Sequence, residues 1–267
     1  MRHFLLPIVI VIAGALRLSA TVVSNPVIYE HAGVKLEGYL AYDNAVVSAE
    51  HKVPGVLVIP EWWGRTDYPK GRAEQLARLG YVAFVADMYG AGVTTTDAKK
   101  AAQLAKPFYG KPLMAERARA GLNQLMATRL VDIAHVGVIG YCFGGSAALA
   151  LAFSGAPVAG VVSFHGSFFP VPQDAATRTK AKLLICHGAI DPFIEPDELT
   201  DFIKSMNSGK FDYQFISYAG AVHAFTNPGA DKLAAANDLT GKIGYNADAD
   251  KRSWEHMRIF LKEVLEK

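Results

Sequence analysis

The sequence has few cysteines and no excess of charge of either sign. Only Cys142 and Cys186 occur among its 267 residues, which excludes a scaffold held together by disulfides. If each ends a strand and one strand lies between them, they are about 9–10 Å apart, so both are expected to be free thiols. The 27 basic and 25 acidic residues give a formal net charge of +2. Without a basic stripe, no nucleic-acid partner is expected.

Repeats, linkers and metal-binding motifs are also missing. No internal repeat, low-complexity tract or long Pro/Gly/Ser linker interrupts the chain, which favours a single domain over residues 21–267. No H-E-x-x-H, paired cysteines or His-x-His spacing occurs, so the sequence predicts neither a metal site nor a cofactor. Hydrophobic residues make up 51% of the chain and charged residues 19%, the composition of a globular protein with one sizeable core.

The N-terminus carries the one long hydrophobic run. In "MRHFLLPIVIVIAGALRLSATVVS" a basic start precedes an apolar stretch from Phe4 to Leu16, and small residues follow up to Ala20. This layout predicts a secretory signal peptide over residues 1–20 and a secreted or periplasmic protein. The stretch is shorter than the ~20 residues of a membrane span, so none is expected after cleavage. A retained anchor is the alternative, because Arg17 and Leu18 form a poor cleavage context.

Apolar, β-branched runs alternate with helix-like stretches along the rest of the chain. The strands are predicted at 34–42, 53–60, 81–88, 135–141, 158–164, 182–187 and 211–218, and the helices at 71–80, 111–129, 144–153, 195–207 and 250–266. Near-continuous apolar strands alternating with helices indicate an α/β fold, a mostly parallel sheet with helices on both faces. Residues 34–42 alternate more and predict an antiparallel edge strand, and residues 226–250 predict a long surface loop.

The stretch "GYCFGG" places Cys142 at the centre of a G-x-C-x-G pattern between a strand and a helix. This is the thiol version of the G-x-S-x-G nucleophile elbow, in which glycines let the strand and helix approach each other. A helix N-terminus also stabilises negative charge on the sulfur. The alternative is a buried structural cysteine. We interpret Cys142 as a nucleophile because its setting is the one that the motif requires.

An elbow nucleophile needs an acid and a base, which follow it in that order along this type of fold. Asp191 comes just after the strand at 182–187, and His223 just after the next strand. Asp-Pro is also a common turn dipeptide, and His223 alone could be a polar loop residue. His165 and His187 also end strands and are interpreted as structural or pocket-lining. The three-residue set nonetheless predicts a triad of Cys142, Asp191 and His223.

A further carboxylate, Glu61, follows the strand at 53–60 in "VLVIPEWWG". It could be a solvated loop charge, but an apolar strand and two tryptophans beside it predict a partly desolvated carboxylate, typical of functional sites. In this type of fold the same loop supplies one oxyanion N–H, and the residue after the nucleophile supplies the other. The backbones of Trp62 and Phe143 are therefore the expected oxyanion hole.

At these residues the sequence resembles the dienelactone hydrolase family of the α/β-hydrolase superfamily. The similarity rests on "GYCFGG", "IPEWWG", "ADMYG", "HGAIDP" and "VHAF", in that order, and extends from about Val27 onward. It implies Cys142 as the nucleophile and Asp191 and His223 as its partners. It also implies that Glu61 contacts the cysteine in the resting enzyme, and that substrate entry releases the cysteine toward the histidine as a thiolate.

The chain departs from the family pattern where the prototype holds a substrate carboxylate. Ala91 stands in place of one arginine, Ala224 follows the histidine in place of a serine, and no arginine occurs shortly beyond it. Arginine is the usual bidentate partner of a carboxylate. A less charged, apolar or aromatic ester or lactone is therefore expected. The residues expected at the mouth of the pocket are Trp62, Trp63, Tyr89, Phe168 and Phe169, although any of them could be core.

The leading hypothesis is an exported cysteine hydrolase that cleaves a small ester or lactone through a thioester, without a cofactor. Polysaccharide deacetylation and peptide hydrolysis are adjacent outcomes between which the sequence does not choose. A non-catalytic binding protein of the same fold is the alternative from another class. A redox thiol protein would need a resolving cysteine near Cys142, and Cys186 is predicted to be too far away.

Overall fold

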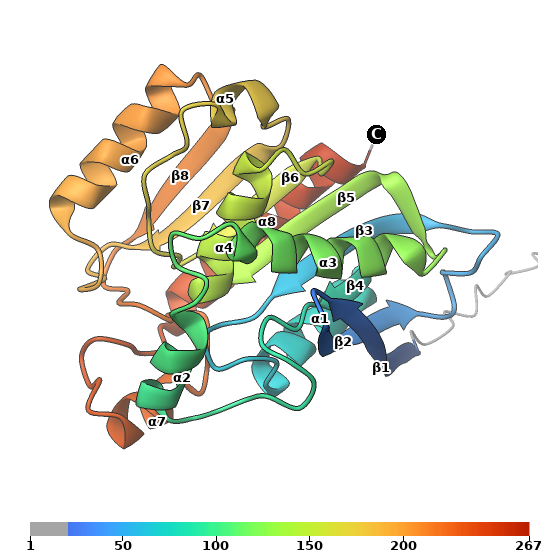
Figure 1. Ribbon diagram of the computed structural model, residues 1–267, viewed down its shortest axis with the longest axis horizontal. Coiled ribbons are helices and arrows are strands. Elements are labelled where there is room, and N and C mark those ends of the chain that lie inside the picture. Colours follow the sequence, from blue (N-terminus) through green and yellow to red (C-terminus); the bar gives the residue numbers. More distant parts are fainter. Residues whose placement is uncertain (1–20, 267) are drawn as a thin grey trace, which may run out of the picture.

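An eight-stranded sheet forms the centre of the molecule (Figure 1). The computed structural model describes residues 21–266, so the expected signal peptide lies outside the described residues. The strands are β1 (Val22–His31), β2 (Val34–Asp43), β3 (Val53–Ile59), β4 (Val82–Val85), β5 (Val131–Tyr141), β6 (Gly160–Phe164), β7 (Lys182–Gly188) and β8 (Tyr213–Tyr218). Their order is β1-β2-β4-β3-β5-β6-β7-β8. The six strands from β4 to β8 are parallel, and β1 and β2 are antiparallel additions at one edge.

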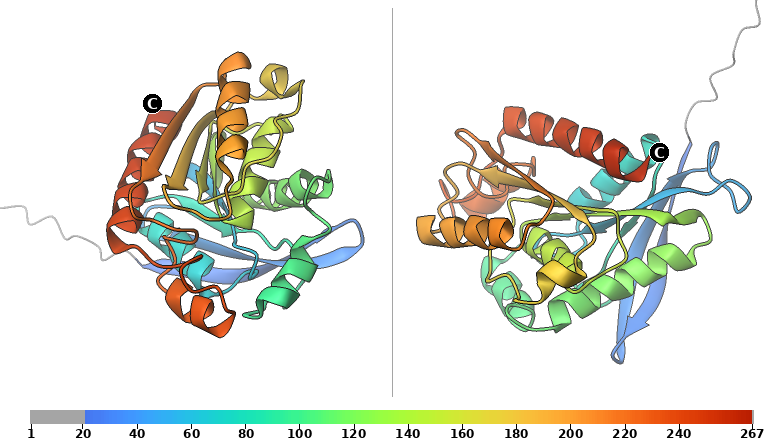
Figure 2. Two further views of the ribbon diagram at one scale, coloured as in Figure 1. Left: turned by 90° about the vertical axis from the view of Figure 1, so that its left-hand side faces the viewer. Right: turned by 90° about the horizontal axis from the view of Figure 1, so that it is seen from above.

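Helices cover both faces of this sheet, as Figure 2 shows. The helices are α1 (Asp67–Arg78), α2 (Ala98–Ala105), α3 (Leu113–Ala127), α4 (Phe143–Phe153), α5 (Ala175–Arg178), α6 (Pro196–Ser208), α7 (Ala230–Ala236) and α8 (Ala247–Leu265). α1 and α8 pack on one face in one buried cluster, and α3, α4 and α6 bury their apolar side chains on the other. Two-sided burial explains why the central strands read as continuous apolar runs.

The predicted fold class, an α/β-hydrolase fold, is confirmed. The seven predicted strands and five predicted helices are present, with ends that differ by at most four residues. The antiparallel strand β2 was expected at the edge of the sheet, which is wrong, because β1 pairs with it along its whole length. The polar residues and Pro26 in β1 hide its strand character from a hydrophobic pattern.

The expectation of a long loop over residues 226–250 is also wrong. Helix α7 lies inside this segment, and α8 already begins at Ala247. Helix α7 has only seven residues, of which Ala230 and Ala234 are buried, so it is too short for a recognisable periodicity. The short helices α2 and α5 escaped prediction for the same reason.

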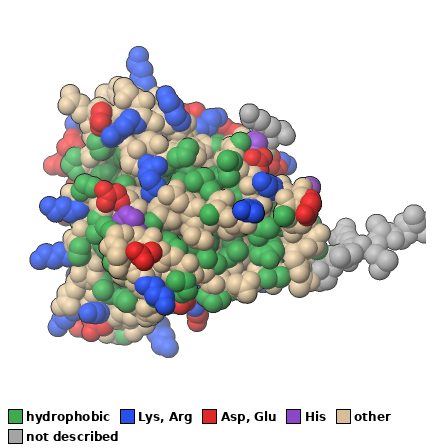
Figure 3. Space-filling view, turned by 45° about the vertical axis from the view of Figure 1, so that its right-hand side comes forward, with side chains coloured by type: hydrophobic (Ala, Val, Ile, Leu, Met, Phe, Trp, Pro, Cys, Tyr) green, Lys and Arg blue, Asp and Glu red, His purple; other side chains and the backbone are tan. Residues whose placement is uncertain are grey.

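The outer surface shows mixed charge. In the face seen in Figure 3, basic and acidic side chains are interspersed, without a continuous region of one sign. Across residues 21–266, no helix combines the length and the apolar character that a membrane crossing needs.

The connection from β5 to α4 brings two backbones unusually close together. A Cβ atom added to Gly140 would lie 1.9 Å from the carbonyl oxygen of Gly144, and one added to Gly144 would lie 2.2 Å from the carbonyl oxygen of Ile59. Real Cβ atoms do not approach backbone oxygens so closely, because the repulsion is too strong. The two glycines that frame Cys142 are therefore required by packing between β5, α4 and β3.

We expect Gly144→Ala to lower the free energy of unfolding by about 3 kcal/mol, the upper end of the usual cost of overpacking, because backbone atoms cannot move aside as a side chain can. Gly71→Ala is the matched control: Gly71 lies in α1, and an added Cβ meets nothing within 4 Å. That variant should be stabilised by about 0.5–1 kcal/mol through its better helix propensity. Urea unfolding monitored by circular dichroism measures both. Equal stability of the two variants would contradict the packing argument.

Candidate active site

Cys142 occupies the turn between β5 and α4 in a strained backbone conformation. Its φ and ψ angles are 55° and −121°, a region that side-chain-bearing residues rarely adopt. Two acceptors hold its backbone N–H: the carbonyl oxygen of Phe164 at 2.9 Å and Nδ1 of His165 at 3.1 Å. The carbonyl oxygen of Cys142 accepts from Gly145 N–H at 2.8 Å. These bonds fix the turn from both sides, and Cys142 itself remains partly exposed.

His223 and Asp191 form a buried pair beside this cysteine. The Nδ1 atom of His223 lies 2.7 Å from Oδ2 of Asp191, and the two side chains are 8% and 1% exposed. The other carboxylate oxygen, Oδ1, accepts from the Phe193 backbone N–H at 2.9 Å. Both oxygens of Asp191 therefore have partners, and its orientation fixes the imidazole ring so that Nε2 remains for Cys142.

The electrostatics of His223 support its contact with the cysteine. Burial lowers the pKa of His223, but the charge of Cys142, together with hydrogen bonds to Asp191 and Cys142, raises it well above its usual range. A buried imidazole with acidic partners on both sides favours its protonated form. The structure thus brings together the three side chains that the sequence predicted as a triad, from the ends of β5, β7 and β8.

Cys142 and His223 face a cavity of about 180 Å³. The ring of Phe193 meets His223 edge-on, with 5.2 Å between ring centroids. The lining residues are Glu61, Trp62, Trp63, Tyr109, Cys142, Ser167, Phe193, His223, Ala224 and Ile243. Sequence reasoning missed Tyr109, Ser167, Phe193 and Ile243. Only Phe193 carried a signal, its place two residues after Asp191 in a loop that follows a strand.

His165 is a structural residue, as interpreted from the sequence, and the structure gives its task. Burial, followed by the charge of His223, lowers the pKa of His165 well below its usual range, so the ring is neutral. Because Nδ1 accepts from the Cys142 N–H, the proton must be on Nε2, which lies 2.7 Å from Oγ1 of Thr226. His165 thereby links the elbow to the segment that follows His223.

This link continues into a buried polar network. Thr226 also accepts from the Tyr68 hydroxyl at 2.7 Å, and its carbonyl oxygen accepts from Arg72 at 2.8 Å. Arg72 in turn forms an ion pair with Asp250 at the start of α8. The network joins α1, the loop after β8 and α8 on one side of the elbow, which makes the site a rigid part of the core.

Glu61 is a desolvated carboxylate, as predicted. It is 2% exposed, and burial raises its pKa to about 7 against the opposing effects of Asn227, His223 and Arg72. Its Oε2 accepts from Asn227 Nδ2 at 2.7 Å, and its Oε1 has no hydrogen-bond partner among the described residues. The resemblance implied a resting contact of Glu61 with Cys142; here Glu61 bonds Asn227 and the cysteine interacts with His223.

Of the two expected oxyanion donors, Trp62 lines the cavity, and Phe143 directly follows Cys142 in the chain. Within residues 21–266, neither the Phe143 N–H nor the Trp62 N–H donates a hydrogen bond to the protein. The Trp62 carbonyl oxygen accepts from the Tyr89 hydroxyl at 3.0 Å, which holds this loop in place. Phe143 is buried and packs its ring against Tyr89 and Tyr109. Both N–H groups are thus available to an oxygen of a bound ligand.

The expected pocket residues occupy three different places. Trp63 lines the cavity at Cys142. Tyr89 lies behind the Trp62 loop and does not line this cavity, and Phe168 lines a larger neighbouring cavity together with Phe169. Aromatic character alone could not distinguish the residues that line the cavity from those that pack behind them.

Cys186 and His187 lie in β7, away from Cys142. β6 separates β7 from β5, and both cysteines are free thiols, as expected. Burial raises the pKa of Cys186 to about 12. The ring of His187 packs between Phe168 and Phe215, and burial lowers its pKa. Neither residue lines the cavity at Cys142.

Comparison with curated proteins gives relatives of modest identity over long alignments. The chain is 28% identical over 242 residues to a probable 2-oxo-3-(5-oxofuran-2-ylidene)propanoate lactonase of Bradyrhizobium sp, covering 86% of this chain and 91% of that protein. It is 27% identical over 195 residues to a carboxymethylenebutenolidase of Rhodococcus opacus, covering 68% and 76%. An uncharacterized protein of Caenorhabditis elegans is 33% identical over 154 residues, which are 55% of this chain and 92% of that one.

Solved structures give the same relationship at higher coverage. A dienelactone hydrolase-like promiscuous phosphotriesterase from metagenomic libraries superimposes with a TM-score of 0.85 at 34% identity, covering 92% of this chain and 99% of that chain. A protein from Klebsiella pneumoniae, with 18% identity and a TM-score of 0.73, shares the fold. The sequence model of the dienelactone hydrolase family matches residues 36–265. The chain therefore belongs to the dienelactone hydrolase family.

Proposed function

We propose that this protein is an exported hydrolase of small esters or lactones that uses Cys142 as its nucleophile and passes through a thioester intermediate. One observation carries the proposal: the buried His223 interacts with Cys142 on one side and Asp191 on the other, at the wall of a cavity. A nucleophile, a base and an orienting acid in contact are the arrangement needed for covalent acyl transfer. The names of the curated relatives, a butenolidase and a lactonase, agree with ester-bond chemistry.

The geometry supports a two-step reaction. The Cys142 thiolate attacks the acyl carbon, and the N–H groups of Phe143 and Trp62 stabilise the oxyanion that forms. The ester C–O bond then breaks, His223 gives its proton to the departing alkoxide, and the acyl group remains on sulfur. A water molecule next attacks the thioester while His223 takes its proton. The C–S bond breaks, which releases the acid and restores the thiolate.

The walls of the cavity favour an uncharged substrate. Of the described residues that line it, none is an arginine or a lysine, and Trp62, Trp63, Phe193 and Ile243 are apolar. A substrate carboxylate would lose its hydration there without gaining a cationic partner. The proposed substrate is therefore a neutral ester or lactone rather than a carboxylate-bearing dienelactone.

A non-catalytic binding protein of the same fold is the competing proposal. Such a protein needs the cavity but not the strained cysteine or the aligned His223–Asp191 pair. A strained backbone persists only where the surrounding structure enforces it, as Gly140, Gly144 and His165 do here. Retention of this arrangement favours an enzyme.

Hydrolysis of p-nitrophenyl acetate tests the nucleophile and the base. We expect Cys142→Ala and His223→Ala each to lower kcat/KM at least about a hundredfold, because each removes a group that forms or breaks bonds. Cys186→Ala is the matched control, since it deletes the other thiol, and it should keep the activity of the wild type. Comparable rates in all four proteins would rule out the proposed mechanism.

Thiol labelling provides a second readout in the same experiment. Iodoacetamide should modify one residue of the native protein, because Cys142 is partly exposed and Cys186 is buried. The label should disappear in Cys142→Ala and persist in Cys186→Ala.

A quenched reaction with the acetate ester should show an acetyl group on Cys142 by peptide mass spectrometry. An acetyl group elsewhere would disprove the thioester.

The raised pKa of Glu61 predicts how stability depends on pH. Because the folded protein holds this proton up to about pH 7 and the unfolded chain releases it near 4.5, the stabilisation is complete below pH 4.5 and is lost as the pH rises to 7. Relative to Glu61→Gln, the wild type should therefore lose about 3 kcal/mol of unfolding free energy over this interval. Urea titrations at several pH values measure it. If the unfolding free energies of the two proteins changed in parallel with pH, the raised pKa of Glu61 would be contradicted.

Export is supported by the N-terminal sequence pattern alone. Expression of the full chain in a bacterial host should yield a mature protein whose N-terminal sequence begins after Ala20, recovered from the periplasm or the medium. Recovery of the uncut chain in the membrane fraction would instead identify the leader as an anchor.

A further inference from the structure

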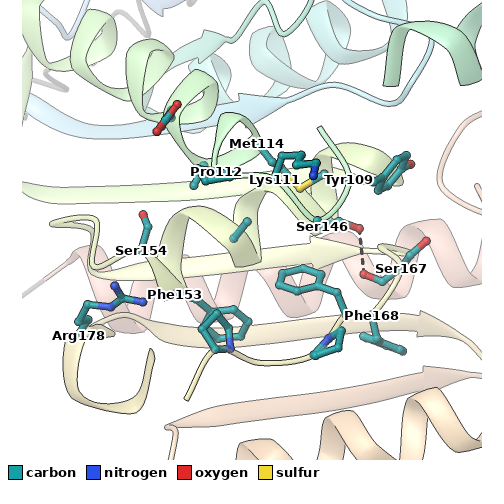
Figure 4. A pocket seen from close by; sticks show the side chains of 17 residues that line it. Tyr109, Lys111, Pro112, Met114, Ser146, Phe153, Ser154, Ser167, Phe168 and Arg178 are labelled. Atoms are coloured by element: carbon teal, nitrogen blue, oxygen red, sulfur yellow. Dashed lines mark hydrogen bonds between the residues drawn. The ribbon is translucent and has the colours of Figure 1, made fainter. Parts of the chain in front are cut away.

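A second cavity lies next to the one at Cys142 and is three times as large, about 540 Å³ against about 180 Å³. It lies between α3, α4 and the loop that follows β6. In the close view of Figure 4, Tyr109, Ser146 and Ser167 stand at one end of this cavity, and Ser154 and Arg178 stand at the other. The rings of Phe153 and Phe168 lie between these ends. Nothing in the mechanism above uses this space.

The two cavities share two wall residues, Tyr109 and Ser167. The Tyr109 side chain is 46% exposed and packs edge-on against Phe143, the residue after the nucleophile. The larger cavity also runs along α4, the helix that begins at Cys142, from Ser146 to Ser154. At 1.5 Å per residue this stretch is about 12 Å long. The larger cavity therefore extends from the cavity at Cys142 along α4.

The position of His223 determines which half of a bound ester extends into the larger cavity. The histidine must protonate the leaving oxygen, so the alcohol half lies on the side of His223, Phe193 and Ile243. None of these three residues lines the larger cavity. The acyl half stays bonded to Cys142 until water hydrolyses the thioester. It therefore extends in the other direction, past Tyr109 and along α4.

The walls of the larger cavity suit an apolar occupant. Met114, Phe153 and Phe168 form its buried part. Two polar groups of its wall already have partners: Ser146 donates to the Ser167 carbonyl oxygen at 2.9 Å, and Arg178 pairs with Asp174 at 2.7 Å. The charged side chains of Lys111 and Glu116 also line this cavity, at exposed sites. In the buried part of the cavity a polar ligand would find few free groups to bond, whereas apolar surface gains free energy when it leaves water.

We infer that this larger cavity binds the acyl chain of the substrate, so that the enzyme acts on esters of medium-length, unbranched fatty acids. The inference rests on the proposed function, because it requires acyl transfer to Cys142. It narrows the substrate class from small neutral esters to those with an apolar acyl chain several carbons long.

The test compares p-nitrophenyl acetate, butyrate and octanoate as substrates. Each buried methylene can raise kcat/KM up to about fourfold. We therefore expect octanoate to exceed acetate at least about tenfold with the wild type. A flat or falling series, with acetate hydrolysis still dependent on Cys142, overturns the inference and leaves the proposed function intact. Loss of the Cys142 dependence would instead reject the proposed function itself.

Two variants fill the cavity from opposite walls. Ala150→Trp projects from α4 and Ala115→Trp from α3, and both positions line the cavity at half-buried sites. Each should reduce the ratio of octanoate to acetate activity at least about tenfold, while acetate activity stays within about twofold of the wild type. Retained acetate hydrolysis also shows that the variant is folded. Ala176→Trp, at an exposed site of α5 outside the lining, is the control and should leave the ratio unchanged.

A matched series distinguishes the acyl half from the alcohol half. Ethyl acetate and octyl acetate vary only the alcohol, and Ala150→Trp should leave the ratio of their rates unchanged. If the variant depresses octyl acetate while the p-nitrophenyl octanoate rate is unaffected, the cavity holds the alcohol, and the assignment to the acyl chain is wrong.

Discussion

The site depends on the strained turn at Cys142. A positive φ angle at a residue with a side chain is unfavourable, and the surrounding structure must enforce it. Gly140 and Gly144 permit backbone contacts that no other residue would allow, and the Cys142 N–H has two acceptors. The result is a sulfur that stands at the carboxyl end of the parallel sheet, above the strands that carry its partners. Ligands in open α/β sheets bind at this end.

The two histidines beside this turn differ in their protonation. His165 is neutral and serves as an acceptor for the backbone of the elbow, while His223, whose ring centroid is 5.3 Å from that of His165, holds a proton between Cys142 and Asp191. The two neighbouring imidazoles differ in protonation because their partners differ. An amide N–H faces the ring of His165, and acidic groups face the ring of His223. Burial also raises the pKa of Glu61, which lines the same cavity as His223, to about 7.

The two cavities give the site a direction. Cys142 and His223 line the smaller one, and the larger runs along α4 with a buried part formed by apolar side chains. Helix α4 begins next to Cys142 and also forms a wall of the larger cavity. Under the proposed function, the helix that positions the sulfur therefore also limits the length of the acyl chain beside it. The missing arginines at positions such as Ala91 agree with this apolar design.

The sequence by itself determined the fold class, the order of the main elements and the residues at the strand ends. Apolar runs that are buried on both faces have a local signature, and so do a nucleophile framed by glycines and a histidine after a strand. It did not reveal β1, α7, Tyr109, Ser167 or the acceptor role of His165, nor that Tyr89 would lie behind the site. These depend on contacts between residues far apart in the chain: His165 and Thr226 are 61 residues apart. Hydrophobic periodicity records which face of an element is buried, but only the packed structure decides what lies against that face.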